Sequence, residues 1–123
     1  MIKKSLGKVD DALNEFWKVL SIDPKKTTAF WEIAIISIDK GKNDEAIRYL
    51  DLAIRFNNTE SSLIFFTRGQ CHSSLGNYHK AIRDFDKAIE LDTDVSVYWI
   101  NRGRSKNFLE QYEEAIKDLD KAI

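Results

Sequence analysis

Apolar side chains recur along this chain at helical spacing, and the pattern itself repeats. An alanine followed by a branched apolar residue marks each copy; a large apolar residue follows after four positions and a small one after seven. The marker alanines are Ala12, Ala46, Ala81 and Ala115, so the copies lie 34, 35 and 34 residues apart. A period of about 34 residues with two helices per unit is the signature of a helical repeat array.

The apolar stretches at helical spacing, with turn residues between them, predict seven helices and no strand. The helices are expected over Val9–Ile22, from Thr27 or Thr28 to about Asp39, and over Asp44–Phe56, Ser62–Leu75, Tyr78–Leu91, Val95–Leu109 and Tyr112–Ile123. Gly41 suits the left-handed position just after a helix; Gly76 occupies the same place in a tight turn of the next copy, and the last copy has Glu110 there. Side chains that can cap a following helix are Thr27 or Thr28, Thr59 or Ser61, and Asn77.

The recurring residues resemble those of the tetratricopeptide repeat family, and the resemblance covers essentially the whole chain. The central copy carries Gly69, Gly76, Tyr78, Ala81, Phe85 and Ala88. The last copy carries Trp99, Gly103, Tyr112, Ala115, Leu119 and Ala122, and the looser second copy carries Phe30, Ala34, Gly41, Ala46, Leu50 and Ala53. The resemblance implies an all-α fold: an α-α superhelix, or tetratricopeptide solenoid, of antiparallel helix pairs in about three and a half repeats.

We therefore expect a single tetratricopeptide-like domain over residues 1–123. It would contain a partial first repeat (1–26), a second repeat (27–61), a third (62–95) and a truncated fourth (96–123). Repeat arrays usually end in a helix with a polar outer face, and none is visible in the sequence. The chain is accordingly expected to be a fragment of a longer array.

Two sets of residues predict how the helices of one repeat meet. Gly69 and Gly103 are expected to leave room for Ala81 and Ala115 of the partner helix. A mid-helix glycine costs about 0.5–1 kcal/mol relative to alanine, so its presence in two copies needs a reason. A packing need would explain why it recurs.

A charge pattern gives a second prediction. Arg68 and Arg102 precede these glycines, and Asp84 and Asp118 occupy matching places on the partner helices. The copy with Ile33 at the arginine place has Tyr49 at the aspartate place. The first prediction is an ion pair within each repeat and the second is a pair across repeats, Asp84 with Arg102. A coincidence in a charged sequence is the third reading.

Composition excludes several classes of function. Of 123 residues 32% are charged, yet the net charge is −1, so no clustered basic surface indicates nucleic-acid binding. A single cysteine excludes an internal disulfide or a cysteine-rich metal site. No apolar run is long enough for a membrane helix, and no signal-peptide core is visible. We expect a cytoplasmic protein without a membrane or nucleic-acid partner.

The sequence offers little for catalysis. His72 stands where the family often has tyrosine and is expected to pack, and His79 lies on an outer helical turn. No His-Glu-x-x-His or similar ligand spacing occurs. Cys71 lies among small core positions and has no evident base. We therefore predict no enzyme, no catalytic residue, no metal and no cofactor.

The resemblance implies a binding surface on the first helix of each repeat, which lines the concave side in this family. The predicted partner-binding residues are Trp31, Glu32, Ile35, Phe66, Thr67, Gln70, Ile100, Asn101, Arg104 and Phe108. Leu63 and Val97 belong to the same surface. Sets of aromatic residues among polar groups are typical of binding surfaces. The alternative for Trp31, Phe66 and Phe108 is packing between neighbouring inner helices.

The leading prediction is a scaffold that binds a peptide or helix of a partner protein in this groove. Some family members grip the carboxylate tail of chaperones with lysine, asparagine and arginine. At the aligned places only Asn101 is of that kind, so no such clamp is expected. One alternative is a stacking module that self-associates through the exposed C-terminal helix, by Ile116, Leu119 and Ile123. Another is a regulatory segment of a larger protein.

Overall fold

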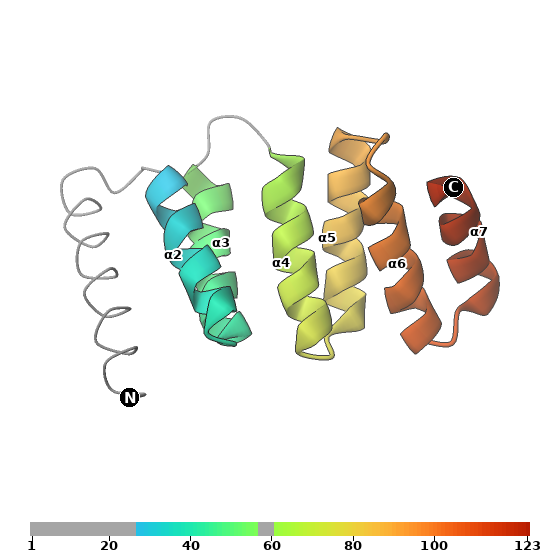
Figure 1. Ribbon diagram of the computed structural model, residues 1–123, viewed down its shortest axis with the longest axis horizontal. Coiled ribbons are helices and arrows are strands. Elements are labelled where there is room, and N and C mark those ends of the chain that lie inside the picture. The colour runs from blue at the N-terminus through green and yellow to red at the C-terminus, as the bar shows by residue number, and fades with distance from the viewer. Residues whose placement is uncertain (1–26, 57–60) are drawn as a thin grey trace. The chain divides into compact units, whose positions relative to one another are not determined.

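The computed structural model describes residues 27–56 and 61–123, which form six helices and no strand. The helices are α2 (Thr27–Asp39), α3 (Asn43–Phe56), α4 (Ser62–Ser74), α5 (Tyr78–Leu91), α6 (Ser96–Phe108) and α7 (Tyr112–Ala122) (Figure 1). The all-α prediction is confirmed, and every predicted helix end in the described ranges lies within one residue of the observed one. The helix predicted over Val9–Ile22 and the partial first repeat lie outside the described residues.

The chain divides into two compact units, Met1–Asn58 and Thr59–Ile123. The first unit contains the helix pair α2 and α3, and the second contains α4 to α7 in consecutive antiparallel pairs (Figure 1). The predicted arrangement of all repeats in one domain stays a prediction. Within the two described stretches, every helix is too short or too polar to cross a bilayer.

The three turns inside the helix pairs share one hydrogen-bonded geometry. Gly41, Gly76 and Glu110 have φ of 73°, 79° and 62°. After each, the next backbone N–H donates to the carbonyl five residues back, as from Asn77 to His72 at 2.8 Å and from Gln111 to Lys106 at 2.8 Å. This is the Schellman turn, which satisfies carbonyls left over at a helix end. The predicted role of the glycines is confirmed, and Glu110 adopts the same left-handed conformation without being glycine.

The predicted side-chain caps at Ser61 and Asn77 are wrong. Ser61 and Asn77 stand at N-cap positions, but neither side chain makes a capping hydrogen bond. Asn77 has ψ of 67°, outside the extended region in which a cap side chain reaches back to the helix. Its backbone is used instead, since its carbonyl accepts from the Ala81 N–H at 3.0 Å. Helix α2 begins at Thr27, so Thr27 and Thr28 lie in the first turn and not before it. Thr59 is outside the described residues.

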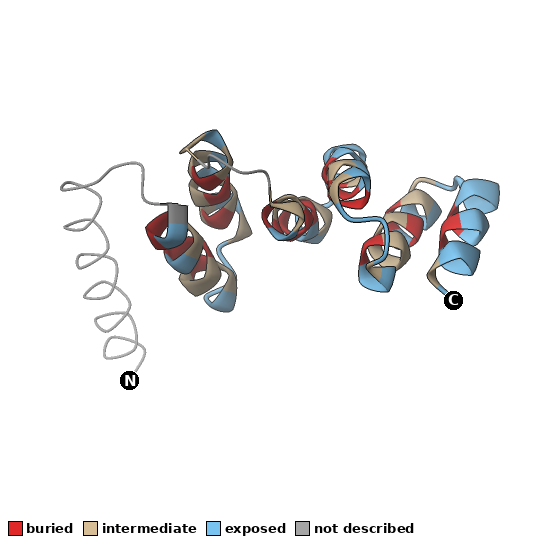
Figure 2. Cartoon of the chain, turned by 90° about the horizontal axis from the view of Figure 1, so that it is seen from above, coloured by how far each residue is buried: buried red, intermediate tan, exposed pale blue. Residues whose placement is uncertain are grey.

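The second unit is built around aromatic packing. Phe66 of α4 lies 5.6 Å from Phe85 of α5 and 4.7 Å from Tyr98 of α6, measured between ring centroids. These residues form one buried cluster with Ala81, Ala88 and Ile89. Buried residues accordingly lie on the sides of α4, α5 and α6 that face one another (Figure 2). In the first unit, Ile33, Ala34, Ala46, Leu50 and Ala53 are fully buried.

The glycine contacts are partly as predicted. A methyl group on Gly103 would meet the Ala115 carbonyl oxygen at 3.2 Å, in agreement with the predicted approach to Ala115. A methyl group on Gly69 would instead lie 2.7 Å from Cε1 of Phe85. The nearest neighbour of position 69 is therefore the Phe85 ring, which leaves no room for a side chain there.

Candidate functional site

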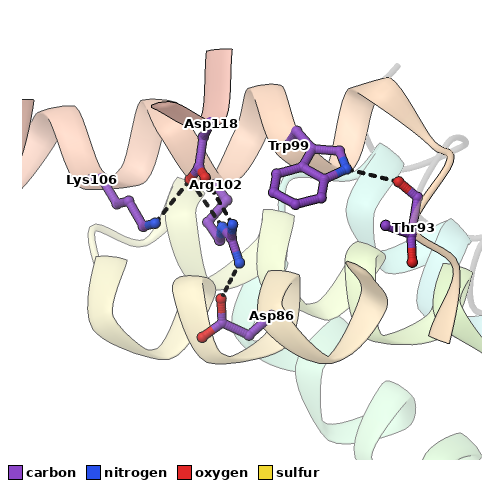
Figure 3. A network of polar contacts seen from close by, with 6 residues as sticks. All are labelled: Asp86, Thr93, Trp99, Arg102, Lys106 and Asp118. Carbon is purple, nitrogen blue, oxygen red and sulfur yellow. Dashed lines mark hydrogen bonds and ion pairs between the residues drawn. The ribbon is translucent and has the colours of Figure 1, made fainter. Parts of the chain in front are cut away.

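The helices of each repeat in the second unit are joined by a bidentate ion pair. Arg68 donates from Nε and Nη2 to Asp84 at 2.9 and 2.6 Å. Arg102 donates from the same atoms to Asp118 at 2.9 and 2.7 Å (Figure 3). Both carboxylates are buried. The predicted pairing of arginine and aspartate within each repeat is confirmed, and it fixes the position of α4 on α5 and of α6 on α7.

Arg102 also forms a bond across repeats. Its Nη1 donates to Oδ1 of Asp86 at 2.7 Å (Figure 3), so the alternative pairing with Asp84 is corrected to Asp86. At 100° per residue, Asp84 and Asp86 point to opposite sides of α5. Asp84 therefore faces Arg68 on α4, while Asp86 faces the following repeat. Sequence reasoning missed Asp86, although an aspartate recurs at Asp51, Asp86 and Asp120.

The electrostatics of this network are those of a structural joint. Lys106 places Nζ 3.0 Å from Oδ2 of Asp118. Burial alone would raise the pKa of Asp118, but hydrogen bonds from Arg102 and Lys106 and their positive charges bring it below its ordinary value. The pKa of Arg102 is raised above its ordinary value. Burial lowers this pKa, but the hydrogen bonds to Asp118 and Asp86 raise it by more. The charged side chains of the network therefore pair with one another.

Trp99 extends the network to the start of α6. Its Nε1–H donates to the Thr93 carbonyl oxygen at 2.9 Å (Figure 3). The Arg102 guanidinium lies 4.8 Å from its ring centroid and Lys121 Nζ lies 6.0 Å from it. Cations at this range are attracted to an indole face. Trp99 therefore connects the loop before α6 with the end of α7.

The structure divides the predicted partner-binding residues between the two units and between surface and core. On α2, Glu32 is exposed and Trp31 and Ile35 are half-buried. Phe66 and Thr67 lie in the core and not on the surface: Phe66 packs on Phe85 and Tyr98, and the Thr67 hydroxyl donates to the Leu63 carbonyl at 2.8 Å. The remaining residues are Gln70, Arg104 and Phe108, which are exposed, and Ile100 and Asn101, which are half-buried.

Three exposed residues of α6 and the half-buried Asn101 form one stripe. Val97, Asn101, Arg104 and Phe108 follow one another by four, three and four positions, which places them on one helix face. Val97 is 43% and Phe108 63% exposed. Phe108 stacks on Tyr78 of α5 with ring centroids 4.6 Å apart and planes at 5°. The stripe therefore has an apolar group at each end and polar groups between them.

Helix α4 contributes to the same surface. The hydroxyls of Ser62 and Tyr98 lie 3.0 Å apart, so the first turns of α4 and α6 are adjacent. Leu63, which follows Ser62, is 50% exposed, and Gln70 lies seven positions further on the same face. Among residues 61–123, the side chain of Arg104 makes no ion pair. We call Leu63, Gln70, Val97, Asn101, Arg104 and Phe108 the α4–α6 surface.

The groups that sequence reasoning considered for chemistry include Cys71 and His72, which both lie on α4. Cys71 is a buried free thiol, and burial, together with the Asp84 charge, raises its pKa to about 11. A thiol with that pKa is protonated at neutral pH. His72 is half-buried, with Nε2 3.9 Å from Oδ2 of Asp84. No cluster of metal-ligating side chains occurs over residues 27–56 and 61–123.

Comparison with known proteins places this architecture in a family. Two family models, both described as tetratricopeptide repeat, match the chain, one over residues 62–94 and the other over residues 27–60 and 97–123. The human protein named tetratricopeptide repeat protein 6 is 29% identical over 85 residues, which are 69% of this chain and 16% of that protein. The chain thus spans a small part of this relative.

Solved structures agree on the fold. The crystal structure of MamA matches with a TM-score of 0.87 at 23% identity and covers 98% of this chain and 70% of MamA. The second tetratricopeptide domain of Spaghetti (RPAP3), bound to an HSP90 peptide, matches with a TM-score of 0.74 at 23% identity and covers 80% of this chain and 92% of that one. At such identities the likeness shows the solenoid fold alone.

Proposed function

The chain belongs to the tetratricopeptide repeat family, and we propose that it acts as a scaffold that binds a segment of a partner protein on the α4–α6 surface. The structure of the RPAP3 domain with an HSP90 peptide supports this class of function. The surface and the ligand chemistry proposed here rest on the residues of this chain.

The exposed stripe of α6 carries the proposal. Val97 and Phe108 are apolar and exposed, and they are eleven positions apart, which is about 16 Å along a helix. An extended peptide covers that distance in about five residues. The ligand would therefore be an extended segment with two apolar side chains on one face, about four or six residues apart, one for Leu63 and Val97 and the other for Phe108 and Tyr78.

The polar centre of the surface sets the second requirement. Arg104 lies between the two apolar ends, beside Asn101 and Gln70, and contributes a cation without an internal carboxylate partner in residues 61–123. An arginine fork binds a carboxylate with two parallel hydrogen bonds. We accordingly expect the bound segment to have an aspartate or glutamate between its two apolar residues.

We also propose a separate binding surface on the first unit. Trp31, Glu32 and Ile35 lie on α2, the first helix of its repeat, and an aromatic side chain beside a carboxylate suits a polar or basic segment. Its contribution is tested by Trp31→Ala, which should weaken a ligand of this surface and leave a ligand of the α4–α6 surface unchanged.

A peptide array screened with the whole chain, followed by titration of the selected peptide, tests the function. Arg104→Glu should weaken binding by roughly tenfold or more, because it removes the carboxylate partner and adds a like charge. Arg83→Glu is the matched control, because Arg83 is exposed on α5 and off the surface. Phe108→Ala should also weaken binding. Equal affinity of wild type, Arg104→Glu and Phe108→Ala would remove the α4–α6 surface as the site.

We propose a non-enzymatic role, in keeping with the family. The cytoplasmic location expected from the sequence stays a prediction, which cell fractionation with an antibody to this chain would test.

A further inference from the structure

The turn between α6 and α7 (Figure 1) carries a glutamate where the other turns within helix pairs carry glycine. Glu110 has φ of 62°, and its counterparts are Gly41 and Gly76. Residues with a Cβ atom rarely adopt this backbone conformation. A carboxylate just after the end of a helix is also unfavourable, because the helix dipole is negative there. Two local preferences therefore disfavour glutamate at position 110.

The fold offers no internal contact that would explain this glutamate. Glu110 is exposed, and over residues 61–123 its carboxylate makes no ion pair. Lys106 precedes it by four positions, but the Lys106 Nζ lies 3.0 Å from Oδ2 of Asp118. A residue that breaks local preferences without an internal gain is expected at a functional position.

Glu110 adjoins one end of the α4–α6 surface. It follows Phe108, the exposed apolar group of that end, by two positions. Gly76 occupies the same place after α4 and is exposed although a further repeat follows it, so the accessibility of position 110 is a property of the turn itself. Along α6 the chain therefore presents, in order, the cation of Arg104, the ring of Phe108 and the carboxylate of Glu110.

We infer that Glu110 selects a basic residue in the bound segment, an inference that rests on the proposed function of the α4–α6 surface. Arg104 and Phe108 are four positions apart, about 6 Å along a helix, and two residues of an extended segment cover about 6.6 Å. The acidic residue of the segment therefore lies two positions from the apolar residue that contacts Phe108. Two positions to the other side, an arginine or lysine shares the same face of the segment and reaches past the end of α6 to Glu110.

Charge favours a basic residue at this place over other side chains. A guanidinium can donate two parallel hydrogen bonds to the Glu110 carboxylate, and an ammonium can donate one. An acidic residue would be repelled, because it would bring a like charge to the edge of the surface. The recognised class is therefore an extended segment with an acid on one side of an apolar residue and a base on the other.

A peptide array tests this selection. Each peptide has an apolar, an acidic and a second apolar residue on one face, followed on that face by a variable residue that is Arg, Lys, Gln or Glu. Serine fills the other positions, the two apolar residues are four or six positions apart, and both chain directions are included. Wild type should bind the peptides with Arg or Lys roughly fivefold or more tightly than those with Glu. Glu110→Gln should abolish this preference and Glu110→Lys should reverse it.

Asp94→Asn is the matched control, because it removes an exposed carboxylate before the start of α6, at the opposite end of the surface. It should leave the preference unchanged. Glu110→Gly separates binding from folding: its denaturant midpoint should rise, while its preference for Arg or Lys is lost.

The same preference in wild type, Glu110→Gln and Glu110→Lys would overturn the inference. If Arg104→Glu and Phe108→Ala still weakened binding in that case, the proposed function of the surface would stand. Binding of no peptide, or binding that ignores Arg104 and Phe108 as well as Glu110, would overturn the inference and the proposed surface together.

Discussion

Arg102 binds Asp86 across the boundary between two consecutive repeats, with 2.7 Å between Nη1 and Oδ1, while its other donors hold Asp118. Arg102→Ala should therefore destabilise the protein by about 3 kcal/mol, because it leaves the buried Asp118 carboxylate with Lys106 alone. Asp86→Ala should cost at most about 1 kcal/mol, since Asp86 is exposed. Urea denaturation measures both, with Arg83→Ala as the surface control. Equal effects of Arg102→Ala and Arg83→Ala on the free energy of unfolding would contradict a stabilising role of the Arg102 contacts.

Asp118 should make stability depend on pH in the acid range. Its pKa in the folded protein lies below the ordinary value of 3.8, so the unfolded chain binds this proton more readily. The stabilisation is therefore complete above the ordinary pKa and is lost as pH falls through the folded pKa. The free energy of unfolding of wild type and Asp118→Asn, measured from about pH 7 to about pH 2, should differ most at neutral pH and converge in acid. A constant difference would show that the Asp118 charge is not responsible.

Gly69→Ala should destabilise the second unit by about 1–3 kcal/mol, because the added methyl group would overlap the buried ring of Phe85. The first unit has Ala34 and Leu50 at the equivalent positions, both fully buried. The double variant Gly69→Ala with Phe85→Leu copies that pair and should recover part of the loss relative to the sum of the single changes. Thermal unfolding of the four proteins measures this coupling; strict additivity would mean that Phe85 is not what excludes a side chain at position 69.

Glu110→Gly should stabilise the protein by about 0.5–1 kcal/mol. Glu110 has φ of 62°, and a residue with a Cβ atom pays roughly 1–2 kcal/mol in the left-handed region, part of which is offset by the greater freedom of an unfolded glycine. The reciprocal change, Gly76→Ala at φ of 79°, should destabilise. Denaturant midpoints test both, and a Glu110→Gly protein less stable than wild type would mean that the glutamate side chain has a favourable contact.

The acidic carboxylate tail of chaperones should not bind at the inner helices. At the places aligned with the family's clamp the chain has Trp31, Ile35, Thr67, Val97 and Asn101. Of these only Asn101 is of the clamp type, and its side-chain amide donates to the Val97 carbonyl at 2.8 Å. A fluorescent peptide ending in Glu-Glu-Val-Asp should show no binding at micromolar concentration, and micromolar affinity would contradict this prediction.

Much of the fold could be predicted because its determinants are local. Glycine at a left-handed turn and the apolar period fix the helix ends, and all observed ends lie within one residue of those predicted. The pairing of Arg68 with Asp84 was predictable because the copy with Ile33 changes both partners together. Features that could be compared between the repeat copies were therefore predictable from the sequence alone.

The parts that could not be predicted depend on which way a side chain points. Asp84 and Asp86 are two positions apart, and only the packing of α4 and α6 against α5 decides which of them meets Arg102. Phe66 was expected on the surface, yet it completes a cluster with two aromatic rings from other helices. Arg104 and Phe108 of α6 are exposed as expected, although the Phe108 ring also stacks on Tyr78 of α5.

The position of Arg102 has a consequence for how the last helix pair melts. Fraying of α7 would break both bonds between Arg102 and Asp118 and leave Arg102 with Asp86 alone, so α7 cannot detach without losing this ion pair while α6 stays in place. Detachment of α6 would in turn uncover the aromatic ring of Tyr98. Local opening at this end is therefore suppressed, and slow amide hydrogen exchange should extend through α6 and α7 as one cooperative unit.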